Sequence, residues 1–132
     1  MELQFVLPET LGEWMAWITA LLTLATGLWM FIQPRMWLRL MGLKTHTDRP
    51  ESVAEMRGPI AGMYVGLGLI VLLLHPQPLL YLVLGACYLF VAIGRLFSMI
   101  VDKGFTGHNT LSLSIETVMA VLPLAYALGY IA

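Results

Sequence analysis

Two ionisable side chains of opposite charge lie inside apolar segments in the second half of the sequence. Arg95 lies in the apolar run 79–101, and Glu116 lies in the run 110–131. Each residue is about six positions from the polar segment that joins the two runs, which corresponds to about 9 Å along a helix. An unpaired charge in hydrocarbon costs on the order of 2.5–3.5 kcal/mol, so we expect Arg95 and Glu116 to pair.

Further polar residues are positioned to extend this pair into a cluster. Ser98 and Asp102 share the helix face of Arg95 at spacings of three and seven residues. The expected intramembrane polar cluster, or ligand site, comprises Glu55, Arg57, Arg95, Ser98, Asp102 and Glu116. One interpretation is an ion-pair network that fixes helix register. The other is a pocket open to the cytoplasm in which the arginines hold an anionic headgroup or a carboxylate.

No other pattern indicates catalysis, a cofactor or a metal. His75 and His108 are predicted at opposite membrane edges, His46 lies in the basic segment, and none of them has a carboxylate or cysteine at metal-ligand spacing. The single cysteine, Cys87, lies in an apolar run and is expected to pack as a small hydrophobic residue. The net charge of -1 gives no general attraction to nucleic acid. We therefore expect no catalytic residues, no metal, no cofactor and no nucleic-acid partner.

The composition places these residues in a membrane protein. Of the 132 residues, 59% are hydrophobic and only 11% are charged, and the mean hydropathy is +0.82. An average soluble domain has about 25% charged residues, so this chain has too few to cover a soluble surface. Continuous apolar runs of about 20 residues predict transmembrane helices rather than strands.

The pattern predicts an all-α integral membrane protein, an up-and-down bundle of four transmembrane helices. The second and third helices are joined by four residues and the third and fourth by a short polar segment, so each pair is expected to be antiparallel neighbours. The expected single membrane domain, 1–132, has helices at about 11–32, 49–74, 79–101 and 110–131 and a basic cytoplasmic loop at 33–48.

The positions of the basic residues predict the orientation. Apart from Arg95, Lys and Arg are confined to the first and third connections and their edges, namely Arg35, Arg39, Lys44, Arg49, Arg57 and Lys103. Basic loops stay on the cytoplasmic side of a membrane. We therefore expect both termini on the outer side.

Two features indicate contacts with lipid or with other helices. Gly58, Gly62 and Gly66 recur every four residues and would form a smooth helix-packing face, a glycine zipper, toward another helix of this chain or of a second copy. The segment 33–42 alternates arginines with bulky apolar residues and predicts a short helix in the headgroup layer. This helix would be a connector held by anionic lipid or a surface on which a partner docks.

The polar residues also carry a family resemblance. The pattern consists of Glu55-x-Arg57-Gly58, a glycine-rich helix, Gly94-Arg95-x-x-Ser98-x-x-x-Asp102-x-Gly104, and Glu116 in the last helix. It resembles the small bacterial four-helix membrane proteins grouped as domain of unknown function 4345, from about residue 34 to the C-terminus. The resemblance implies a four-span integral membrane protein and supplies no activity.

These observations predict a small multi-pass protein of the bacterial inner (cytoplasmic) membrane. We expect a non-catalytic accessory or assembly subunit of a larger membrane complex, or a binder of a lipid-like ligand, with membrane lipid as a partner and a homo-oligomer as another form of assembly. The alternative is a small transporter or membrane enzyme that acts on an amphiphilic substrate through a pocket at Arg95 and Glu116.

Overall fold

A computed structural model describes residues 3–44 and 49–132, and all regular structure in this part of the chain is helical. Four helical segments are long and apolar enough to cross a membrane: Leu11–Ile32, Pro50–Leu73, Pro78–Val101 and Gly107–Ala127. The predicted all-α class with four membrane-length segments is confirmed. The chain divides into two compact units, residues 1–19 with 73–132 and residues 20–72. Each unit is described by itself, and the single four-helix bundle stays a prediction.

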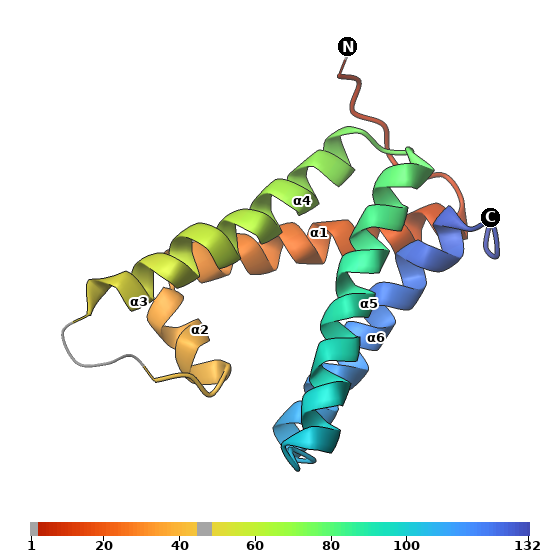
Figure 1. The fold of residues 1–132 in the computed structure, drawn as a ribbon. Coiled ribbons are helices and arrows are strands. Elements are labelled where there is room, and N and C mark those ends of the chain that lie inside the picture. The colour runs from red at the N-terminus through yellow and green to blue at the C-terminus, as the bar shows by residue number, and fades with distance from the viewer. Residues whose placement is uncertain (1–2, 45–48) are drawn as a thin grey trace. The chain divides into compact units, whose positions relative to one another are not determined.

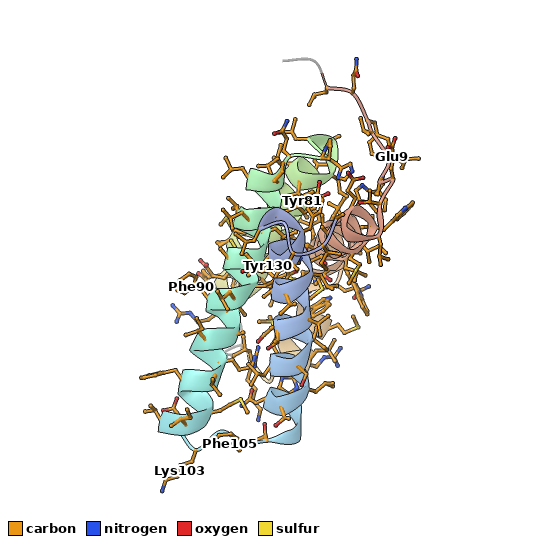
Figure 2. The ribbon with its side chains drawn as sticks, turned by 90° about the vertical axis from the view of Figure 1, so that its right-hand side faces the viewer. Glu9, Tyr81, Phe90, Lys103, Phe105 and Tyr130 are labelled. Atoms are coloured by element: carbon orange, nitrogen blue, oxygen red, sulfur yellow. The ribbon has the colours of Figure 1, made fainter. Side chains whose placement is uncertain are left out.

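The first unit is built around a helical hairpin. Helices α5 (Pro78–Val101) and α6 (Gly107–Ala127) run side by side and antiparallel (Figures 1 and 2), as the short connection between them predicted. Figure 2 shows Lys103 and Phe105 at the connecting end of the hairpin, with Tyr81 and Tyr130 toward the other end. The start of α1 (Leu11–Ile32) belongs to the same unit, and the Gly12 N–H donates to the Ala132 carbonyl at 2.7 Å.

Local hydrogen bonds explain why α6 occupies 107–127 rather than the predicted 110–131. The Thr106 side chain accepts the Asn109 N–H and caps the helix three residues earlier than expected. Gly129 adopts a φ of 82°, and the N–H groups of Gly129 and Tyr130 donate to the carbonyls of Tyr126 and Ala125. This pair of bonds is a Schellman motif, which ends the helix before the apolar sequence ends.

The end of α5 has the same type of cap with a different residue. The Gly104 N–H donates to the Met99 carbonyl at 2.9 Å, and Lys103 between them has a φ of 55°. The left-handed region disfavours residues other than glycine. The tight connection between α5 and α6 therefore depends on a lysine in a strained backbone conformation.

The second unit packs α2 (Pro34–Leu40), α3 (Pro50–Glu55) and the π-helical turn η1 (Met56–Ile60) with parts of α1 and α4 (Ala61–Leu73). Its core consists of Met30, Leu38, Met56 and Ala61. The predicted short helix in 33–42 is present as α2. Pro59 lies inside η1, where the wider turn accommodates a residue that lacks an N–H donor.

Close contact between α1 and α4 in this unit uses two glycines that the sequence pattern did not single out. A Cβ added to Gly27 would lie 2.7 Å from the Val65 backbone nitrogen, and one added to Gly68 would lie 2.6 Å from the Leu24 backbone nitrogen. The two helices run side by side in Figure 1. These glycines allow the two backbones to approach each other.

The predicted glycine zipper lies elsewhere on the helix. A Cβ added to Gly58, Gly62 or Gly66 would meet no described atom within 4 Å. Gly68 follows Gly66 by two residues, so it is rotated by about 200° and faces away from that stripe. The helix-packing role of Gly58, Gly62 and Gly66 stays a prediction that needs a partner other than α1.

Candidate functional site

The predicted contact between Arg95 on α5 and Glu116 on α6 is present and bidentate. Arg95 Nε donates to Glu116 Oε2 at 2.8 Å, and Nη2 donates to Oε1 at 2.7 Å. The two side chains are 29% and 13% exposed. The two parallel hydrogen bonds fix the relative orientation of the guanidinium and the carboxylate, in addition to the attraction between their charges. The ion pair therefore links α5 and α6 at this depth of the hairpin.

Asn109 extends this pair toward the connection between the helices. Its Oδ1 accepts from Arg95 Nη1 at 3.0 Å, and its Nδ2 donates to the Gly104 carbonyl at 2.8 Å. Asn109 therefore links the Arg95 guanidinium to the connection between α5 and α6, at Gly104. Asn109 was not part of the cluster expected from the sequence.

Ser98 and Asp102 form a separate, exposed contact one turn apart on α5. The Ser98 hydroxyl donates to Asp102 Oδ2 at 2.7 Å. The carboxylate of Asp102 near the end of the helix is thus bonded within α5. The structure brings Arg95 together with Glu116, and Ser98 together with Asp102.

Glu55 and Arg57 lie in the other unit. Arg57 Nε donates to the Phe31 carbonyl at 2.8 Å, and its guanidinium carbon lies 5.8 Å from the centre of the Phe31 ring. This contact satisfies a carbonyl in the last turn of α1, which has no partner within its own helix. Glu55 is exposed at the end of α3. The joining of these residues to Arg95 in one cluster stays a prediction.

A groove of about 320 Å³ lies beside the ion pair on the first unit. Its lining is polar at one end and apolar at the other, and it comprises Phe90, Val91, Gly94, Arg95, Ser98 and Asn109. A Cβ at Gly94 would meet no atom within 4 Å in the described part of the chain. The groove is therefore open at Gly94, where the α5 backbone is exposed. No group of three or more His, Cys, Asp or Glu residues in 3–44 and 49–132 is arranged to hold a metal ion.

Comparison with protein families gives one match that covers most of the chain. The family described as domain of unknown function (DUF4345) matches residues 12–127. The chain belongs to this family. The resemblance noted from the sequence is thus confirmed, and the match begins earlier, near the start of α1. No curated protein and no solved structure matches the chain.

This DUF4345 chain has a second polar cluster, at the opposite end of the hairpin, which sequence reasoning missed. The buried His75 ring contacts Tyr81, with Nδ1 2.7 Å from the Tyr81 Oη, and its Nε2 lies 3.8 Å from Glu13 Oε2. The Tyr81 and Tyr126 rings pack edge to face at 5.2 Å. Burial lowers the pKa of His75 below its usual 6.5, and the Glu13 charge acts in the opposite direction. One signal was available: the expected orientation, with both termini outside, places the start of the first helix with Glu13 and the connection with His75 at the same membrane edge.

Proposed function

We propose that this DUF4345 protein is a multi-pass protein of the bacterial inner membrane that binds a lipid-like amphiphile without catalysis. It would serve in this way as an accessory subunit of a larger membrane assembly. The observation that carries the proposal is the groove beside Arg95, which combines a fixed cation with an apolar wall on a single helix face.

The polarity of the groove favours an amphiphile over a small soluble ligand. Arg95 lies about six residues from the end of α5, and Phe90 lies five residues deeper. At 1.5 Å per residue these positions are about 9 Å and about 17 Å from the helix end. A polar headgroup beside Arg95 and Ser98 would therefore place its apolar chain beside Phe90 and Val91.

The contacts inside the site favour binding over catalysis. Arg95 donates to both Glu116 and Asn109, and Ser98 donates to Asp102. A nucleophile requires an adjacent general base within hydrogen-bond reach, and such bases are most often histidines. None of the six residues that line the groove is a histidine, and His75 belongs to the cluster at the other end of the hairpin. The groove thus offers a shaped surface with a fixed charge.

The orientation follows from the distribution of charge. The basic residues Arg35 and Arg39 lie in α2, Lys44 follows it, and Lys103 lies in the connection between α5 and α6. With these segments in the cytoplasm, both termini face outward. The headgroup end of the groove then lies in the inner leaflet. A reporter that is active only after export, fused after Ala132, should be active, and a cytoplasm-dependent reporter should be inactive; the reverse pattern would contradict this orientation.

Native mass spectrometry of the protein released from mild detergent tests the binding proposal. We expect a lipid-sized adduct on the wild type and its loss in Gly94→Leu, because the leucine side chain would fill the open part of the groove. Cys87→Leu is the matched control, since Cys87 is exposed on the same helix outside the groove. Equal adducts on both variants would contradict the proposal. Turnover of an amphiphile that is lost in Glu116→Gln would favour the transporter or enzyme alternative.

A further inference from the structure

His75 contacts two helices, α1 and α5, at the end of the first unit where α5 begins. It lies in the connection before α5, its Nδ1 contacts Tyr81 on α5, and its Nε2 faces Glu13 in the first turn of α1. The His75 side chain is fully buried. Its Nε2 has no hydrogen-bond partner among the described residues. A buried polar atom without a partner is costly and needs an explanation.

The neighbouring groups determine which nitrogen of neutral His75 carries hydrogen. Tyr81 is fully buried, and in the described part of the chain its hydroxyl has no hydrogen-bond partner other than His75. A buried hydroxyl hydrogen needs an acceptor. The Tyr81 O–H therefore donates to Nδ1, and the hydrogen of neutral His75 is on Nε2. This N–H points toward the Glu13 carboxylate, which at 3.8 Å is beyond hydrogen-bond distance.

The Glu13 carboxylate is held in position by the backbone that precedes α1. Glu13 Oε2 accepts from the Glu9 N–H at 2.8 Å and from the Thr10 N–H at 3.4 Å. Its side chain is 20% exposed, so the carboxylate connects the buried imidazole with the surface. Backbone donors of this kind favour the charged form of a carboxylate. A proton that reaches His75 would thus meet an oriented negative charge.

We propose that His75 is a proton-binding site, in which uptake of one proton at Nδ1 reverses the Tyr81 hydrogen bond and closes an ion pair between Nε2–H and Glu13. In the neutral state the Tyr81 O–H donates to Nδ1. In the protonated state Nδ1–H donates to the Tyr81 oxygen, Tyr81 keeps its own hydrogen, and Nε2–H donates to the carboxylate. Proton uptake would tighten the first turn of α1 onto the segment before α5.

The groups around His75 determine when the proton binds. The described titratable residues that face it are Glu13 from α1 and Tyr81 from α5, with Tyr126 from α6 packed against Tyr81 and Glu9 bonded through its backbone to Glu13. Burial favours the neutral imidazole, whereas the Glu13 charge favours the protonated one. The opposing effects make the site sensitive to acidification rather than permanently charged.

Nitrogen NMR of the ¹⁵N-histidine-labelled full chain in detergent tests this inference on the wild type. We expect the Nε2–H tautomer for His75 at pH 8 and a titration midpoint below 6.5, the usual value for histidine, with His75→Gln used to assign the signal. Glu13→Gln should lower the His75 midpoint by about one pH unit, because it removes the charge that favours the protonated imidazole.

Three results would overturn the proposal. The first is an Nδ1–H tautomer in the wild type, because it reverses the assigned direction of the Tyr81 hydrogen bond. The second is a His75 midpoint at or above 6.5, the usual value for histidine. The third is a midpoint that is unchanged in Glu13→Gln, which would show that the carboxylate does not act on the imidazole. The wild-type measurements do not depend on whether either variant folds.

Discussion

Breaking the Arg95–Glu116 pair from one side should destabilise the protein more than removing both charges. In Arg95→Leu, Glu116 keeps its charge at 13% exposure and loses its donors Nε and Nη2. In Glu116→Leu, the Arg95 guanidinium loses the same contacts. Truncating one partner of a buried ion pair costs about 3–5 kcal/mol. Because Arg95 is 29% exposed, we expect about 2–4 kcal/mol for each single change.

The double variant measures the interaction free energy between Arg95 and Glu116 apart from the loss of each side chain. Arg95→Leu with Glu116→Leu leaves no unpaired charge, and Asn109 keeps its bond to the Gly104 carbonyl. We expect its loss to be smaller than the sum of the single losses by about 1.5–3 kcal/mol, the range for hydrogen bonds to charged groups. The same cycle on the exposed Ser98 and Asp102 contact is the control, with an expected coupling below about 1 kcal/mol.

Reversible unfolding in mixed micelles, followed by tryptophan fluorescence over an SDS titration, measures these free energies. Additive losses from Arg95→Leu and Glu116→Leu would refute the pairing argument. A coupling at Ser98 and Asp102 as large as the one at the ion pair would refute the argument that burial sets the magnitude. A double variant that is stable but no longer carries the lipid-sized adduct would assign the pair to the ligand site as well as to the fold.

Four other substitutions test further parts of the structure. Gly68→Ala should destabilise the protein by about 1–3 kcal/mol, because the new Cβ would lie 2.6 Å from the α1 backbone. Gly62→Ala should stabilise it by about 0.5–1 kcal/mol in the same micelle assay, because a Cβ there meets no described atom within 4 Å. A loss of stability in Gly62→Ala would instead reveal a helix packed on the face of Gly58, Gly62 and Gly66. Lys103→Gly should stabilise by about 0.5–1 kcal/mol because it relieves a φ of 55°, and an unchanged midpoint would contradict the assigned strain. Burial lowers the pKa of His75 in the folded state, so the stability from its neutral form is present above about pH 6.5 and is lost as the pH falls. His75→Gln should therefore flatten the decline in the free energy of unfolding between about pH 7 and 5. A decline as steep as that of the wild type would contradict this origin.

The contact between two residues of the site could be predicted from the sequence. Arg95 and Glu116 could be paired from sequence because a charge in an apolar segment has few ways to be satisfied, and the short connection sets both at the same depth. The hairpin of α5 and α6 follows from the same connection. In these cases distance along the chain converts directly into distance in space.

Other features depend on contacts that spacing does not encode. Glu13 and His75 are 62 positions apart, and their contact needs the start of α1 to lie beside the segment before α5. Gly27 and Gly68 lack the four-residue repeat, yet they are the glycines in contact between α1 and α4. The repeat at Gly62 and Gly66 identifies a smooth face but not what covers it. The sequence of one helix thus predicts which residues share a face, whereas the face that packs against another helix depends on that partner helix.

The most direct test of the proposed function is photolabelling in the membrane with a phospholipid that carries a photoactivatable group at its headgroup end. We predict that the label concentrates on the α5 segment 90–98, beside Arg95 and Ser98, and that Gly94→Leu abolishes this concentration while Cys87→Leu preserves it. Labelling spread evenly over the exposed apolar faces of all four membrane-length helices, and unchanged in Gly94→Leu, would contradict the account.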